Sequence, residues 1–172
     1  PGKYSALAAQ TSASVCISCL GGTFAVSGGL SECTACGAGK ASSAGSSVCV
    51  ACLPGEKLVG STCEVCNEGR YSGIGATTCT TCERGRFQNA TSQAACIACG
   101  VGKYGDQWGQ ITEGSGAGDG CKNCVKGKYS SALGATAESQ CNACPAGKRG
   151  DPAAVGTSSG HCTPCKEGTY QG

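Results

Sequence analysis

Cysteine is the residue type that carries the chemistry of this chain, and its spacing repeats from one end to the other. All 18 cysteines among the 172 residues fall into Cys-x-x-Cys pairs. The nine pairs are Cys16/Cys19, Cys33/Cys36, Cys49/Cys52, Cys63/Cys66, Cys79/Cys82, Cys96/Cys99, Cys121/Cys124, Cys141/Cys144 and Cys162/Cys165. Thiols at this spacing can hold zinc, act as a redox couple or form structural disulfides.

A longer phrase surrounds each pair, and Cys63-x-x-Cys66-x-x-Gly69-x-Tyr71 is a clear example. The repeat glycine stands three residues after each second cysteine, at Gly22, Gly39, Gly55, Gly69, Gly85, Gly102, Gly127, Gly147 and Gly168. The aromatic slot follows two residues later and holds Phe24, Tyr71, Phe87, Tyr104, Tyr129 and Tyr170, or else Ala41, Lys57 and Arg149. Pro1-Gly2-Lys3-Tyr4 is the same phrase without its cysteines. Every Tyr and Phe therefore occupies one slot of an internal repeat, whose period is roughly 14 to 25 residues.

Zinc and redox chemistry are weaker interpretations of these cysteines than disulfides. Two Cys-x-x-Cys pairs at this separation would suit a zinc ribbon. Nine pairs, however, cannot be divided evenly into four-cysteine sites, and zinc does not require the glycine and the aromatic residue. A thioredoxin-like redox site needs one pair at the start of a helix. We therefore expect disulfides, with no metal and no cofactor.

Several pairing schemes would satisfy a disulfide framework. Bonds within each pair would staple no fold, so we prefer to join the second cysteine of one pair to the first of the next. This scheme gives Cys19–Cys33, Cys36–Cys49, Cys52–Cys63, Cys66–Cys79, Cys82–Cys96, Cys99–Cys121, Cys124–Cys141 and Cys144–Cys162. Cys16 and Cys165 are then left for partners beyond the two ends. An overlapping scheme, in which both cysteines of a pair reach into the same neighbouring pair, stays open.

The composition indicates a small disulfide-rich fold outside the cell. Large aliphatic residues are sparse, so each repeat can bury little more than one ring and its own cysteines. A disulfide that closes a loop of about fifteen residues contributes roughly 3 kcal/mol, and such bonds persist in oxidising compartments. We expect an elongated tandem array of short β-hairpin and loop repeats, with little regular secondary structure and no helix. Each repeat should contact only its neighbours.

The spacing divides the chain into three parts. Residues 1–99 hold tightly spaced repeats, residues 100–120 hold a repeat with an inserted loop, and residues 121–172 hold looser repeats. Trp108 and Ile111 in the inserted loop are the candidate contact residues, although a floppy loop whose Trp covers its own repeat is the simpler interpretation. Asn89-Ala90-Thr91 is an N-glycosylation sequon and predicts a glycan on Asn89. Both ends fall within a repeat, and we expect a segment of a longer protein.

No set of residues indicates catalysis. The sequence has no nucleotide-binding loop, no candidate catalytic triad and no paired carboxylates. The single histidine, His161, is expected at the surface, and Asp106, Glu113 and Asp119 lack the spacing of a calcium loop. The net charge of +2 without a basic block disfavours nucleic acid and membrane contact by this segment. We therefore expect a protein that is not an enzyme.

The phrase from Cys63 to Ser72, and again from Cys121 to Ser130, resembles the ephrin-receptor-like cysteine-rich repeats. It is also similar to the looser repeats of tumour-necrosis-factor receptors, except that every cysteine here lies in a Cys-x-x-Cys pair. The resemblance implies an extended ladder of disulfide-linked β modules outside the cell. The spacers look like those of protist surface antigens, and related repeats occur in very large surface and fibre proteins of algae and protists.

Two functions follow as hypotheses. The first is a structural rod segment of a long secreted or cell-surface protein in an extracellular fibre or coat, whose partners are neighbouring repeats or other copies. The second is a ligand-binding receptor or adhesion ectodomain, or a protist surface antigen.

Overall fold

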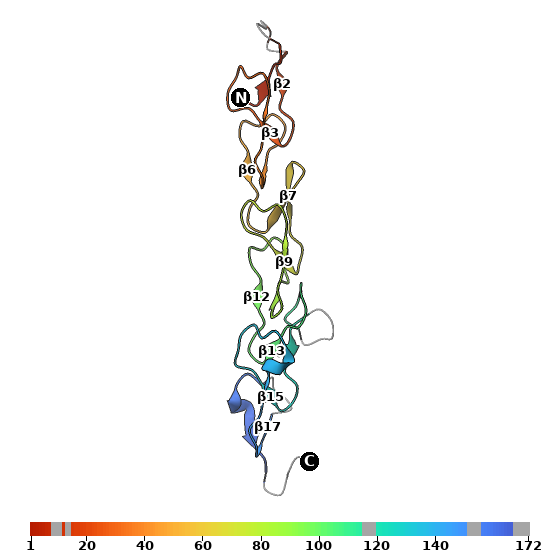
Figure 1. The fold of residues 1–172 in the computed structure, drawn as a ribbon, viewed down its shortest axis with the longest axis vertical. Helices are drawn as coiled ribbons and strands as arrows, with labels where there is room; N and C mark the ends of the chain where they lie inside the picture. Colours follow the sequence, from red (N-terminus) through yellow and green to blue (C-terminus); the bar gives the residue numbers. More distant parts are fainter. Residues whose placement is uncertain (8–11, 13–14, 115–119, 151–155, 167–172) are drawn as a thin grey trace. The chain divides into compact units, whose positions relative to one another are not determined.

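The chain folds into very short strands held together by disulfides. The computed structural model describes residues 1–7, 12, 15–114, 120–150 and 156–166, so Gly168 and Tyr170 lie outside the described residues. Within these ranges there is no α-helix, and the helical turns are the 3-10 helices η2 (Glu138–Gln140) and η3 (Ser159–His161). Figure 1 shows the strands as short arrows separated by longer connections. The predicted fold class, small and disulfide-rich with short hairpins, is confirmed for the described residues.

The strands are mostly two residues long. They are β1 (Lys3–Tyr4), β2 (Ile17–Ser18), β3 (Thr23–Phe24), β4 (Thr34–Ala35), β5 (Lys40–Ala41), β6 (Val50–Ala51), β7 (Glu56–Val59), β8 (Thr62–Val65), β9 (Arg70–Tyr71), β10 (Thr80–Thr81), β11 (Arg86–Phe87), β12 (Ile97–Ala98), β13 (Lys103–Tyr104), β14 (Lys122–Asn123), β15 (Lys128–Tyr129), β16 (Asn142–Ala143), β17 (Lys148–Gly150) and β18 (Cys162–Pro164).

Each odd-numbered strand pairs with the even-numbered strand that follows it, which gives nine two-stranded sheets in the described residues. The first strand contains the aromatic slot, and the second usually contains the two residues between a pair of cysteines. In the β3–β4 sheet, for example, Thr23 lies opposite Ala35 and Phe24 opposite Thr34, antiparallel. The β7–β8 hairpin is longer, with four residues in each strand. The repeat seen in the sequence is therefore a repeat of hairpins.

Packing divides the chain into two compact units. One comprises Pro1–Asn67, Tyr71–Thr80 and Thr91–Ala95, and the other comprises Glu68–Arg70, Thr81–Ala90 and Cys96–Gly172. Segments of the two units alternate along the sequence between residues 67 and 96. Neither unit has a large apolar core, because the buried apolar residues are mainly cysteines, with a few alanines and the rings of Phe87 and Tyr104.

Candidate functional site

Sixteen cysteines form eight disulfides, all of the kind that joins one pair to the next. The bonds are Cys19–Cys33, Cys36–Cys49, Cys52–Cys63, Cys66–Cys79, Cys82–Cys96, Cys99–Cys121, Cys124–Cys141 and Cys144–Cys162. These are the links of the consecutive scheme, and Cys16 and Cys165 carry no disulfide in the structure. Each bond closes a loop that contains the first strand of a hairpin, and the second strand begins within one residue of the cysteine that ends the loop. Because a disulfide sulfur is no longer a thiolate, the sixteen bonded cysteines cannot supply a zinc ligand set.

We expect iodoacetamide, applied under denaturing and non-reducing conditions, to leave these sixteen cysteines unlabelled. The physical reason is that each sulfur is bonded to a partner in the next pair. Peptide mass spectrometry after labelling checks this prediction site by site, with a fully reduced sample as the control. Labelling spread over the internal pairs, or zinc bound in proportion to them, would contradict it.

In each Cys-x-x-Cys pair, the second cysteine makes a backbone hydrogen bond to the repeat before it. The N–H group of the cysteine donates to the carbonyl oxygen of the preceding repeat glycine, as Cys36 does to Gly22 at 2.9 Å. The nine donor and acceptor pairs are Cys19–Gly2, Cys36–Gly22, Cys52–Gly39, Cys66–Gly55, Cys82–Gly69, Cys99–Gly85, Cys124–Gly102, Cys144–Gly127 and Cys165–Gly147. All nine bonds are 2.8 or 2.9 Å long. The junction between repeats is thus made by main-chain atoms, which tolerate changes in the neighbouring side chains.

The carbonyl oxygen of the same cysteine is hydrogen-bonded to the repeat that follows it in the sequence. It accepts a hydrogen bond from a residue in the spacer of the following repeat, which we call the turn residue. The donor and acceptor pairs are Gly45–Cys19, Gly75–Cys52, Ser92–Cys66, Gly109–Cys82 and Gly134–Cys99, at 2.8 to 2.9 Å. All five turn residues have positive φ, between 59° and 74°. Ser92 is the only described residue other than glycine with positive φ, and it occupies a position that the other repeats give to glycine.

The turn residue also lies against a repeat glycine two repeats away. A Cβ built on Gly39 would overlap the carbonyl oxygen of Gly75, and one on Gly85 would overlap that of Gly134. The same overlap with main-chain atoms would occur for a Cβ on Gly2 against Gly45, on Gly55 against Ser92 and on Gly69 against Gly109. The expectation that a repeat contacts only its immediate neighbours is therefore wrong. Glycine permits this close approach because it has no Cβ, and three successive repeats meet at each such junction.

The two buried rings pack on the disulfide of the next loop. Phe87, 4 % exposed, forms a cluster with Cys99 and Cys121, and Tyr104, 8 % exposed, forms one with Cys124, Cys141 and Ala135. Phe87 belongs to the loop closed by Cys82–Cys96, so the ring covers a neighbour's disulfide rather than its own. The sequence predicts that Tyr71 and Tyr129 each pack on the disulfide of their own repeat or on the glycine turn of the next repeat, and both are half-buried. Tyr104 likewise contacts Ala135, which follows the turn residue Gly134 of the next repeat.

The residue after the aromatic slot has a structural role that the sequence did not reveal. Ser72 is 2 % exposed, and its hydroxyl donates to the carbonyl of Glu56 at 2.8 Å, while its own carbonyl accepts from the N–H of Gly55 at 2.9 Å. Ser42 bonds Thr23 and Gly22 in the same way. A serine here fastens two adjacent repeats at two points. Serine recurs directly after the aromatic slot at residues 42, 72 and 130, and this recurrence could have indicated the role of the position.

The inserted loop is held by side chains in its described part, residues 105–114 and 120. Gln110 is 1 % exposed, and its Nε2 donates to the carbonyl of Gly120 at 2.7 Å. Lys103 donates to the carbonyl of Glu113 at 2.8 Å. Gln110 and Lys103 therefore give the described part of the loop specific hydrogen-bond partners.

The two candidate contact residues have different surroundings. Trp108 is 60 % exposed, whereas Ile111 is half-buried and lies beside Gly69. Nearby, Lys122 Nζ is 2.7 Å from Asp106 Oδ2, and this hydrogen bond lowers the pKa of the Asp106 carboxyl. Trp108 is therefore the candidate that remains available to a partner.

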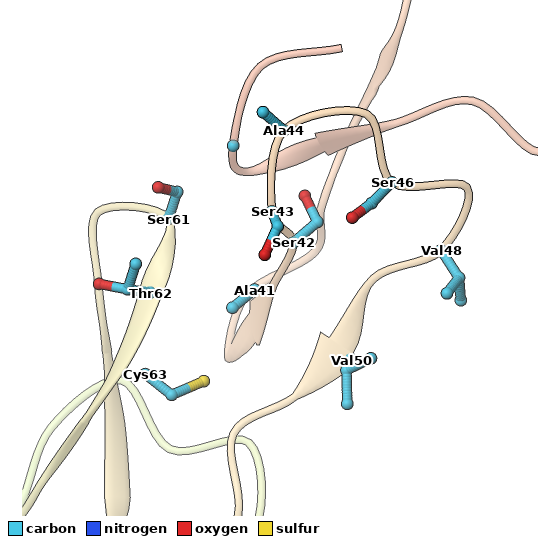
Figure 2. A pocket seen from close by; sticks show the side chains of 11 residues that line it. Ala41, Ser42, Ser43, Ala44, Ser46, Val48, Val50, Ser61, Thr62 and Cys63 are labelled. Carbon is cyan, nitrogen blue, oxygen red and sulfur yellow. The ribbon is translucent and has the colours of Figure 1, made fainter. Parts of the chain in front are cut away.

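An open hollow of about 620 Å³ lies beside strands β5, β6 and β8. One part is lined by Ala41, Ser42, Ser43, Ala44, Ser46, Val48 and Val50, and another by Ser61, Thr62 and Cys63, as Figure 2 shows. The lining residues carry no charged side chain. Within the described ranges no three His, Cys, Asp or Glu side chains come together as a metal site. The hollow therefore offers apolar and hydroxyl contacts rather than charged ligands.

Asn89 is exposed, and so is Thr91. We expect Asn89 to carry a glycan when the chain is secreted from a eukaryotic cell, because an accessible Asn-x-Thr is the acceptor sequence. Digestion with an N-glycosidase should lower the mass by one glycan, and Asn89→Gln should abolish this shift. Asn67→Gln, which alters an exposed asparagine outside any sequon, is the control. An unchanged mass after digestion would contradict the prediction.

The eight disulfides and their recurring junctions define a class of protein: a disulfide-stapled tandem repeat. The family model described as tyrosine-protein kinase ephrin type A/B receptor-like matches residues 69–113. Together with the regular array of bonded cysteines, this match shows cysteine-rich repeats of the ephrin-receptor-like type. Such repeats fit an extracellular, receptor-type repeat region. No curated protein matches the chain. The helices in the described residues are all too short or too polar to cross a membrane.

Proposed function

We propose that this chain is a structural rod segment of a long secreted or cell-surface protein that forms part of an extracellular fibre or coat. The observation that supports this proposal is the junction made by the second cysteine. Its N–H group bonds the repeat before it in all nine pairs, and its carbonyl group bonds the repeat after it in five, with nearly constant geometry in spacers of different sequence. A junction of main-chain atoms can be propagated over many repeats. The partners are neighbouring repeats and other copies, with no enzymatic activity, cofactor, nucleic acid or membrane contact.

A receptor or adhesion ectodomain is the second candidate. The match to ephrin-receptor-like repeats favours it, as does Trp108, which is exposed in the described part of an insertion that the tighter repeats lack. In this case the insertion would meet a ligand, and repeats on either side would act as a spacer.

Immuno-electron microscopy with antibodies against this segment tests the first proposal. Labelling should follow extended surface structures, and the labelled material should sediment as assemblies after extraction without detergent. Material that needs detergent for extraction and sediments as single molecules would instead support the receptor. An antibody against an unrelated surface protein is the control for the labelling.

The shape of the segment gives an independent expectation. A compact chain of 172 residues would have a radius of gyration of about 16 Å. We expect small-angle X-ray scattering to give a clearly larger value, because repeats that bond in sequence order have no shared core to fold around. A value near the compact figure would contradict the rod. The reduced and alkylated chain serves as the expanded reference.

A further inference from the structure

The aromatic slot has a fixed set of neighbours where its ring is buried. Phe87 forms an isolated β-bridge with Gln110, and Tyr104 forms one with Ala135. Gln110 and Ala135 each follow directly after a turn residue of the next repeat. Both rings also lie on the next disulfide. A buried slot residue thus faces two groups: the residue after the turn and a cysteine of the following loop.

The hollow is bordered by the same positions. Ala41 occupies the aromatic slot of its repeat. Ser61 follows Gly60, the positive-φ residue of the next spacer, and Cys63 belongs to the next disulfide, Cys52–Cys63. All three line the hollow, and Figure 2 shows Ala41 between the segment 61–63 and the two valines. The hollow therefore lies where a ring would lie if residue 41 were aromatic.

The hollow also presents exposed apolar side chains. Val48 and Val50, which also line the hollow, are 60 % and 63 % exposed. With no charged lining residue, the site suits an uncharged, flat and largely apolar group. An aromatic side chain from outside has this chemistry.

We propose that the hollow receives Trp108 from a second copy of this chain. Among the described aromatic residues, the Tyr and Phe rings are buried or half-buried, and Trp108 alone is exposed. The proposal rests on the proposed function, since it names the contact between copies in a fibre or coat. A contact that joins different surfaces of two copies is heterologous and generates open filaments when the rotation does not close.

The small area of the contact determines how strongly two copies associate. An aromatic side chain buries about 150–250 Å², whereas a stable interface buries about 1,200 Å² or more. One ring in one hollow is therefore too small for a stable dimer. In an assembly that presents many copies, effective concentration makes such contacts add up. The association is expected to be weak for the isolated segment and strong for the assembled protein.

Photo-crosslinking detects a weak contact directly. The probe is benzoylphenylalanine in place of Trp108, irradiated in a concentrated solution of the segment, followed by peptide mapping. We expect crosslinked dimers with the adduct within residues 41–50 or 61–63. The same probe in place of Leu133, which is 71 % exposed and also precedes a turn glycine, is the matched control and should not give these adducts.

A second experiment fills the hollow with a side chain of the same molecule. Ala41→Tyr restores a ring to the slot, so it should lower the yield of these crosslinks at least about tenfold, the factor that corresponds to 1.4 kcal/mol. Arg149→Tyr, which adds a ring to another slot, is the control and should leave the yield unchanged. Adducts scattered over the surface, or a yield that Ala41→Tyr does not change, would overturn the proposal.

The two proposals fail in different ways. If antibodies label a fibre or coat but the crosslinks do not reach the hollow, copies assemble through another surface. If the protein is extracted as a single membrane-bound molecule, the fibre proposal fails regardless of the crosslinks. A crosslink to an added aromatic peptide that exceeds the crosslink between copies would assign the hollow to a different partner and overturn the contact with Trp108.

Discussion

Replacing Gly85 by alanine is expected to destabilise its repeat by about 1–3 kcal/mol more than the same replacement at Gly127. Both glycines have positive φ, 77° and 81°, so alanine in the left-handed region costs about 1–2 kcal/mol at either position. They differ in what the new Cβ would meet. At Gly85 it would overlap the carbonyl oxygen of Gly134, whereas at Gly127 no described residue outside its chain neighbours comes within 4 Å. Overpacking of this kind typically costs about 1–3 kcal/mol more.

Hydrogen exchange measured by mass spectrometry separates the two variants. In Gly85→Ala we expect faster exchange at the amides of Cys99 and Gly134, because Cys99 donates to the Gly85 carbonyl and Gly134 donates to the Cys99 carbonyl. In Gly127→Ala the change should be small and confined to its own repeat. Equal exchange in the two variants would show that the approach of Gly85 to Gly134 does not matter for stability.

Truncating Phe87 to alanine should be the most damaging change to a side chain outside the disulfides. The ring is 4 % exposed, and replacement of a buried Phe by Ala costs about 3–5 kcal/mol. Because the ring packs on Cys99 and Cys121, the loss should loosen the loop closed by that disulfide as well as its own. Phe24→Ala is the chemically matched control. Its ring is half-buried, so a smaller effect is expected.

The same exchange experiment tests this prediction. Protection should fall in residues 82–96 and 99–114 of Phe87→Ala, with both disulfides still present by mass. Faster exchange in residues 82–96 alone would mean that the ring acts only within its own loop. Unchanged protection in both loops would show that the ring contributes little to packing.

The cysteine pattern predicted the local fold because it constrains covalent geometry. A pair spaced by two residues places its two sulfurs in different loops, and the residues between them form the second strand of a hairpin, as in β4 and β12. The aromatic slot was found in the same way, since all the Tyr and Phe residues share one offset. These features depend on residue types that are rare elsewhere in the chain, so their periodicity is visible.

The junctions between repeats were not predictable because main-chain groups make them. The N–H of Cys82 and the carbonyl of Gly69 carry no side-chain signature of their pairing. The turn position was not recognised because it is not always glycine: Ser92 adopts there the left-handed conformation that four glycines adopt in other repeats. Gln110 was passed over as a loop residue although it is buried and bonded to Gly120. Close approach across two repeats is a property of three-dimensional packing that no local pattern records.

The consecutive pairing of the cysteines has a mechanical consequence. When the chain is pulled from its ends, tension passes through a Cys-x-x-Cys segment, crosses a disulfide and enters the next segment. The residues inside each loop, between 11 and 22 in sequence separation, bear no load. The load path per repeat is then about 10 Å for three extended residue steps, plus 5.4 to 5.8 Å between the bonded Cα atoms. In a reduced chain each loop would lengthen by roughly 30–70 Å when fully extended. The disulfides thus act as a built-in limit to stretching, and a reducing agent would convert a nearly inextensible tether into an elastic one.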